Sequence, residues 1–134
     1  MTYFAFIHRS ESGAFGVSFP DLPGCIALGD SFEDATNEAR IALRLHLAGL
    51  HDDGEAIPPP RSFEELERDP AFLEDRTDAV ALVQITPQLR TGQVKRVNIT
   101  LDEGVLEAID WQAKRLGLTR SAFIARSATD AVSD

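Results

Sequence analysis

Three polar side chains with the chemistry needed to read the edges of DNA bases stand at alternate positions in the second half of the chain. Arg96 can donate two hydrogen bonds to guanine N7 and O6, Asn98 can pair with adenine N6 and N7, and Thr100 can contact either base. The positions that follow them hold apolar residues: Val97, Ile99 and Leu101. This alternation predicts a β-strand over residues 94–101 with one polar face and one apolar face.

A single strand of this kind cannot satisfy its own backbone edges, so it needs a partner. If a second copy of the chain supplies that partner, the two strands form a ribbon whose width fits the major groove of B-DNA. The competing interpretation is a surface strand whose polar residues only face water. The helical patterns that follow the strand favour the first interpretation, which is a dimeric DNA-binding protein.

Two helical patterns would hold the predicted strand in place. Asp102 can cap the first helix, Gly117 stands where that helix would end, and Thr119 can cap the second. About 40 residues rarely support a core alone, so we expect one core shared by two chains. The predicted members of this dimer core are Val97, Ile99, Leu101, Ile109, Phe123 and Ile124.

Residues 94–132 resemble the ribbon-helix-helix (β-α-α) family of transcriptional repressors, and the alternating strand and the sequence LGLTRSAFI carry the resemblance. The resemblance implies that the polar strand residues named above contact bases. It also implies that backbone N–H groups at the start of the second helix hold a DNA phosphate. The predicted phosphate contacts are Thr119, Arg120 and Ser121.

The first part of the chain predicts a small sheet with one long helix, in the order β-β-β-α-β. Ser31 can cap that helix, and residues 62–66 are interpreted as a short helical turn within a mobile acidic connection. The predicted strands cover residues 3–8, 15–19, 25–28 and 79–85.

This order of elements and one motif resemble the N-terminal domain of HicB antitoxins. The motif is FGVSFPDLPGCIALGDSFEDATNEARIAL over residues 15–43, in which Gly24 and Ser31 have backbone roles. The resemblance implies a partial ribonuclease H-like fold and an antitoxin of a type II toxin–antitoxin system. Such an antitoxin binds and neutralises a small basic HicA-type toxin, which cleaves messenger RNA, and represses its own operon by binding operator DNA.

Together these patterns predict an α+β protein that forms a homodimer, and N-terminal contacts could raise the assembly to a tetramer. We expect a HicB-like toxin-binding domain over residues 1–87, a linker over residues 88–93, and a ribbon-helix-helix domain for DNA binding and dimerisation over residues 94–134. The chief alternative is a stand-alone ribbon-helix-helix repressor whose N-terminal domain senses a small molecule. A ribonuclease is a third and less favoured alternative.

The charge of the chain is divided unevenly. Residues 1–90 hold seven Arg and no Lys against sixteen Asp or Glu, so their net charge equals the −9 of the whole chain. An acidic body repels phosphates, so the N-terminal part is expected to meet a basic protein while the C-terminal part touches DNA. The alternative is that the acidity only promotes solubility. The residues that would contact a toxin are not identifiable from the sequence.

The sequence does not indicate an enzyme or a metal site. Ribonuclease H chemistry needs several carboxylates around a pair of Mg²⁺ ions, but the predicted N-terminal strands contain no Asp or Glu. Asp34 and Glu38 fit the wet face of a helix, and His46 and His51 do not have the spacing of a zinc pair. We therefore expect no catalytic residue, no metal and no cofactor.

Cys25 is the only cysteine, so it cannot form a disulfide within the chain. No apolar run approaches the length of a membrane-spanning helix. These features predict a cytoplasmic protein that does not associate with a membrane.

Overall fold

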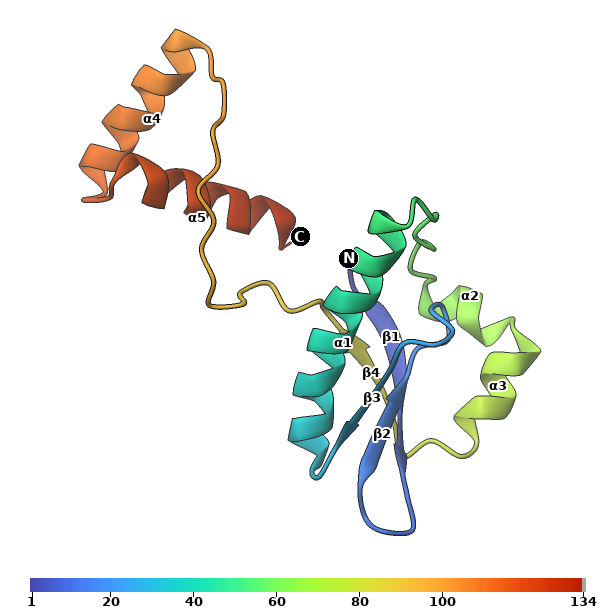
Figure 1. Ribbon diagram of the computed structural model, residues 1–134. Coiled ribbons are helices and arrows are strands. Elements are labelled where there is room, and N and C mark those ends of the chain that lie inside the picture. Colours follow the sequence, from blue (N-terminus) through green and yellow to red (C-terminus); the bar gives the residue numbers. More distant parts are fainter. Residues whose placement is uncertain (134) are drawn as a thin grey trace. The chain divides into compact units, whose positions relative to one another are not determined.

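The computed structural model describes residues 1–133. The chain divides into two compact units, Met1–Thr91 and Gly92–Asp134, which we call unit 1 and unit 2. Figure 1 labels the helices and strands of both units. Unit 1 contains a four-stranded antiparallel sheet, and unit 2 contains two helices, so the predicted α+β class is confirmed.

The sheet of unit 1 has the strand order β3-β2-β1-β4, so β3 and β4 form its two edges. The strands are β1 (Tyr3–Arg9), β2 (Phe15–Ser18), β3 (Ile26–Gly29) and β4 (Ala81–Ile85). The third strand begins one residue later than the sequence predicts. The reason is local, because the N–H of Cys25 donates to the carbonyl oxygen of Leu22 at 3.1 Å and so belongs to the preceding turn.

Helix α1 (Phe32–Asp52) covers one face of the sheet (Figure 1). Ser31 caps it as predicted, because its hydroxyl accepts from the N–H of Asp34 at 3.0 Å. The helix buries the residues that recur along one side and pack against the inward residues of the strands: Ala35, Ala39, Leu43 and Leu47. This packing forms the main core of unit 1.

The turn from β3 into α1 requires a glycine at position 29. A Cβ atom on Gly29 would lie 2.6 Å from Cα of Ala35 and 2.7 Å from the carbonyl carbon of Asp34. Both are backbone atoms of the first helical turn, so they cannot rotate away as the end of a side chain could. Glycine therefore sets how closely α1 approaches the edge strand.

Two short helices, α2 (Phe63–Glu67) and α3 (Pro70–Arg76), lie on the other side of the sheet (Figure 1). They form a second small core in which Leu66 and Phe72 are buried against Phe6 of β1. The rings of Phe6 and Phe72 stack with centroids 5.1 Å apart. The expectation of a mobile acidic connection was therefore wrong, because apolar side chains within the acidic segment anchor it to the sheet.

A charged network also joins this segment to the turn between β2 and β3. The nearly buried carboxylate of Asp21 accepts from the backbone N–H of Arg61 at 2.9 Å and from its guanidinium. The same guanidinium donates to Asp69, which caps α3, at 3.0 Å. The hydrogen bonds that Arg61 donates to Asp21 and Asp69 raise the pKa of Arg61, and the bond to Asp69 lowers the pKa of that carboxyl. The network therefore favours the charged forms of Arg61 and Asp69.

Unit 2 consists of an extended segment followed by α4 (Glu103–Arg115) and α5 (Arg120–Val132). Asp102 caps α4 by accepting from the N–H of Gly104 at 2.9 Å. The helix ends at Gly117, which adopts a φ of 68°, and the N–H of Leu118 returns to the carbonyl oxygen of Ala113 at 2.8 Å. Within the described part of unit 2, only Ala113 is buried, so one chain does not enclose a core there.

The predicted strand over residues 94–101 is not formed by the single chain. Across the described residues, no strand is assigned to this segment and no backbone hydrogen bond joins it to another element. Figure 1 draws it as a plain trace that leads into α4. The physical reason is that a strand needs a neighbouring strand, and unit 2 has no other segment that could serve as one.

Candidate nucleic-acid interface

A groove in unit 2 brings together residues that the sequence analysis assigned separately to bases and to phosphate. Arg96 and Asn98 of the extended segment line this groove together with Arg120 and Ser121 of α5. Thr100 lines an adjoining hollow that Arg120 also borders. The polar residues of the predicted strand thus lie beside the start of α5.

The start of α5 offers free hydrogen-bond donors to this groove. Thr119 caps the helix, because its hydroxyl oxygen accepts from the N–H of Ala122 at 3.1 Å and its carbonyl oxygen accepts from the N–H of Phe123 at 2.9 Å. Among residues 1–133, no acceptor is found for the backbone N–H groups of Arg120 and Ser121. Two unpaired N–H groups at the positive end of a helix dipole can hold a phosphate.

The side chain of Arg120 is already engaged within the unit. Its Nε and Nη2 atoms donate to the two carboxylate oxygens of Asp110, both at 2.9 Å. This pair lowers the pKa of Asp110 and raises that of Arg120. The pair ties the first turn of α5 to α4.

The residues predicted to form the dimer core are incompletely covered in one chain. Val97 is 74% exposed and Ile99 is 59% exposed, and Leu101 is also exposed. The remaining predicted members, Ile109, Phe123 and Ile124, are half-buried. An apolar row on a segment without a strand partner leaves a surface that a second chain could cover.

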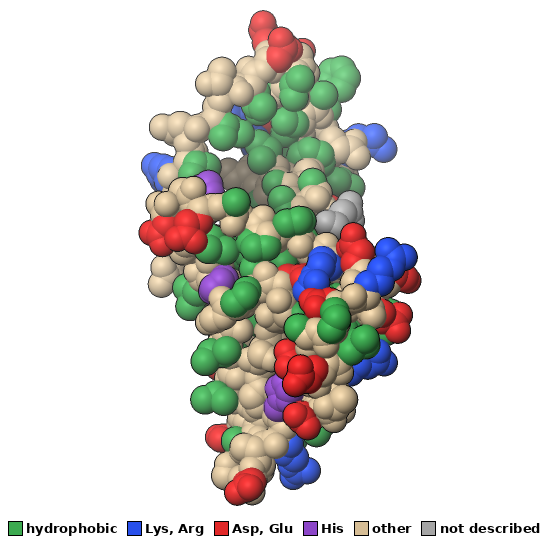
Figure 2. All heavy atoms as spheres, turned by 90° about the vertical axis from the view of Figure 1, so that its right-hand side faces the viewer, with side chains coloured by type: hydrophobic (Ala, Val, Ile, Leu, Met, Phe, Trp, Pro, Cys, Tyr) green, Lys and Arg blue, Asp and Glu red, His purple; other side chains and the backbone are tan. Residues whose placement is uncertain are grey.

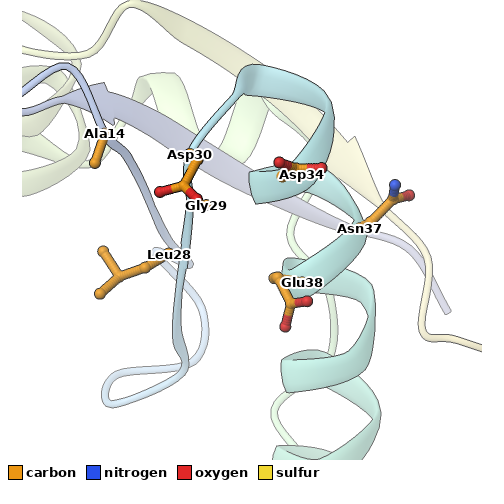
Figure 3. Close-up of a pocket in the computed structure, with 7 residues that line it drawn as sticks. All are labelled: Ala14, Leu28, Gly29, Asp30, Asp34, Asn37 and Glu38. Carbon is orange, nitrogen blue, oxygen red and sulfur yellow. The ribbon is translucent and has the colours of Figure 1, made fainter.

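Unit 1 carries a different kind of site, an acidic hollow at the junction of β3 and α1. It is lined by Leu28, Gly29 and Ala14 and by four polar side chains, which Figure 3 shows around it: Asp30, Asp34, Asn37 and Glu38. The sequence analysis placed Asp34 and Glu38 on a wet helix face, and both are exposed.

The exposed apolar residues of β3 were missed from the sequence. Ile26 is 67% exposed and Leu28 is 72% exposed, whereas Ala27 between them is buried. The available signal was the alternation itself, which puts Ile26 and Leu28 on the face of the strand opposite to Ala27. What the sequence did not reveal is that no helix covers this part of the second face.

The remaining candidates for chemistry are the thiol of Cys25 and groups of side chains that could bind a metal ion. Cys25 is buried in the main core, and desolvation raises the pKa of its thiol to about 11, so it is protonated at neutral pH and a poor nucleophile. In the described part of the chain, no group of three or more His, Cys, Asp and Glu side chains is placed to hold a metal ion. None of the helices described between residues 1 and 133 is long and apolar enough to cross a membrane.

Known proteins resemble this chain across both units. A sequence-family model described as "HicB_like antitoxin of bacterial toxin-antitoxin system" matches residues 3–128. An uncharacterized 14.9 kDa protein from the rep-hol intergenic region of Haemophilus phage HP1 (strain HP1c1) is 31% identical over 110 residues, which cover 82% of this chain and 80% of that protein.

Solved structures agree with these matches. The crystal structure of the Burkholderia pseudomallei antitoxin HicB matches with a TM-score of 0.53 and 28% identity, over 98% of both chains. A structure described as "HicA3 and HicB3 toxin-antitoxin complex" matches with a TM-score of 0.53 and 29% identity, over 66% of this chain and 100% of that chain. Since the family model spans both units and nearly the whole sequence, this chain belongs to the HicB-like antitoxin family of bacterial toxin–antitoxin systems.

Proposed function

We propose that this chain binds and neutralises a HicA-type toxin through unit 1 and represses its own operon by binding operator DNA through a dimer of unit 2. The observation that carries the proposal is the family match over residues 3–128, which includes both units. It is supported by the similarity of this chain to a chain in a solved complex of HicA3 and HicB3.

The charge of unit 1 supports a basic protein partner. The negative charge of the whole chain resides in residues 1–90. An acidic surface attracts a small basic protein over distances of about 8–10 Å at physiological salt, and this attraction raises the rate of encounter. The same charge repels nucleic acid, so DNA contact is assigned to the neutral unit 2.

The arrangement of unit 2 supports DNA binding by two chains. When residues 94–101 of two copies pair, each strand satisfies the backbone groups of the other, and their apolar faces are covered together. The opposite faces would present Arg96, Asn98 and Thr100 of both chains to the major groove. The free N–H groups at the start of α5 would then fix the register by holding a phosphate.

The alternative of a stand-alone repressor with a small-molecule sensor has less support. The family match begins at residue 3 and covers the N-terminal unit as well as the C-terminal one. A unit 1 that belongs to an antitoxin family is therefore assigned to a protein partner rather than to a small ligand.

Two experiments test the two halves of the proposal. The full chain, carrying an affinity tag, is co-expressed with the product of a small basic reading frame beside its gene. We expect the two proteins to co-purify, and the product alone to cleave RNA and to lose this activity in the complex. In the second experiment, fluorescence anisotropy with the DNA upstream of the operon should show specific binding that weakens steeply as salt rises.

Each half can fail separately. A chain that does not retain the neighbouring product, while remaining folded by circular dichroism, contradicts the antitoxin assignment to that product. Equal affinity for the upstream DNA and for an unrelated duplex contradicts repression through base contacts.

A further inference from the structure

One part of the sheet in unit 1 is left without a cover. Helix α1 packs on one face, while α2 and α3 cover Phe6 and Leu82, from β1 and β4, on the other. Strand pairing places Ile26 opposite Ser18 and Leu28 opposite Gly16 on the part that remains open. Figure 2 views this side, where charged side chains gather over α2 and α3 and apolar side chains also come to the surface. Two large apolar residues are thus presented at the edge of the sheet.

The exposed flank of α1 continues this surface. Asp34, Glu38, Ile41 and Leu45 recur at the spacing of one helical stripe, and Asp34 and Glu38 share a hollow with Leu28 of β3 (Figure 3). Leu45 is 56% exposed and extends the stripe with another apolar side chain. The stripe therefore runs along the β3 side of the helix.

The basic residues of α1 lie on its other flank. Nε of Arg40 donates to the carbonyl oxygen of Thr86 at 3.3 Å, and Nε of Arg44 donates to the amide oxygen of Gln88 at 3.2 Å. Both acceptors follow β4, at the opposite edge of the sheet from β3. These two guanidinium groups are therefore turned away from the acidic hollow.

The carboxylates of the hollow are not neutralised within the chain. In the described structure, neither Asp30, Asp34 nor Glu38 forms an ion pair, and the ion pairs of unit 1 involve Arg61 and Arg76 instead. An apolar strip beside three free carboxylates presents both parts of a typical protein interface, an apolar centre and a charged rim.

We propose that the β3–α1 rim, defined by Ile26, Leu28, Asp30, Asp34, Glu38 and Leu45, is the surface on which the basic toxin docks. This inference rests on the proposed function and adds the contact surface to it. The apolar residues lie under an apolar patch of the toxin, and the carboxylates receive Lys or Arg side chains at its margin. The outer edge of β3 also offers unpaired backbone groups to a partner.

Charge selects this occupant over a second copy of the chain. A symmetric contact between two identical rims would bring the three carboxylates of one copy toward the three of the other. Like charges placed across an interface oppose association, whereas a basic partner is attracted by the same groups. Nucleic acid is disfavoured for the same reason.

The test compares rim variants of the full-length chain with matched controls on α3. Glu38→Lys reverses a rim charge, and Glu74→Lys makes the same reversal at an exposed position of α3. Leu28→Ser removes a rim apolar side chain, and Leu73→Ser does so at an exposed position of α3. The probe is an inactivated variant of the neighbouring toxin, titrated calorimetrically into each antitoxin.

We expect Leu28→Ser, at the apolar centre, and Glu38→Lys, which sets like charges against each other at the margin, each to raise the Kd for the toxin by about tenfold or more. Each control should change the Kd by less than about threefold. Thermal unfolding followed by circular dichroism checks that each variant is folded. If Leu28→Ser does not fold, the surface substitution Glu38→Lys still decides the question.

The outcomes separate this inference from the proposed function. If the unaltered chain does not bind the toxin, the proposed function fails. If it binds and the folded rim variants bind equally well, the rim is not the docking surface. If Leu28→Ser and Glu38→Lys instead change the mass of the free antitoxin in light scattering, with unchanged toxin affinity, the rim joins copies of this chain and the inference is overturned.

Discussion

Replacing Gly29 with alanine should destabilise unit 1 far more than the same replacement at Gly16. The Cβ of Gly29→Ala would lie 2.6 Å from Cα of Ala35, whereas an ordinary contact begins at 3.4 Å. The first turn of α1 would therefore have to move by about 1 Å, and overpacking of this kind costs about 1–3 kcal/mol, with more where backbone must shift. We expect a loss near 3 kcal/mol, the upper end of that range.

Gly16 provides the control because it lies in the neighbouring strand. Its added Cβ would meet only Cδ2 of Leu28, at 3.7 Å, which is an ordinary van der Waals contact. A glycine in a strand also loses more conformational freedom on folding than alanine, so Gly16→Ala should change stability by less than about 1 kcal/mol.

The assay is urea unfolding of unit 1 within the full chain. With a slope of about 2 kcal/mol per molar urea, the loss in Gly29→Ala corresponds to a midpoint lowered by roughly 1.5 M. The only Trp of the chain, Trp111, lies in unit 2, so its fluorescence should not report this change. Circular dichroism follows the unfolding of unit 1. Coincident midpoints for Gly29→Ala and Gly16→Ala would refute the argument from close approach.

Two further substitutions and one thiol reagent test the base contacts, the shared dimer core and the burial of Cys25. Arg96→Ala should weaken specific operator binding by about 1–3 kcal/mol, while toxin affinity stays the same. Operator binding is measured by gel shift, with Arg126→Ala as the charge-matched control. Equal losses of operator affinity in the two variants would contradict the assignment of Arg96 to base contacts. Ile99→Asp should convert the proposed dimer to monomers in light scattering, while Val94→Asp on the other face should not, and a dimeric Ile99→Asp would contradict the shared core. Because burial raises the pKa of Cys25 to about 11, only about one thiol in a thousand is ionised at pH 8. A thiol reagent should therefore label Cys25 only as fast as the chain unfolds. Rapid labelling of the native chain would be inconsistent with a buried thiol.

Local signals in the sequence predicted much of the fold. The four strands of unit 1, the Ser31 cap of α1 and the caps of α4 and α5 each depend on a few neighbouring residues, and all were anticipated. Membership of a family of antitoxins agrees with the expectation that the chain is not an enzyme.

The features that escaped prediction depend on residues far apart in the chain. The second core joins Phe6 to Leu66 and Phe72, and the short helices that carry them have too few turns for a helical period to be read. Exposure of Ile26 and Leu28 likewise depends on where α2 and α3 stop covering the sheet. The strand predicted over residues 94–101 is a different case, because in the proposed dimer its formation depends on a second chain.

The near absence of buried residues in unit 2 has a consequence for the level of the protein in a cell. If unit 2 covers its apolar residues only in the proposed dimer, the fraction of chains in the dimer falls as the concentration of the chain falls. Proteases act on such open protomers more readily than on the sheet-containing unit. If unit 2 represses the operon and unit 1 binds the toxin as proposed, loss of unit 2 would release the operon from repression, while the remaining copies of unit 1 would still bind the toxin.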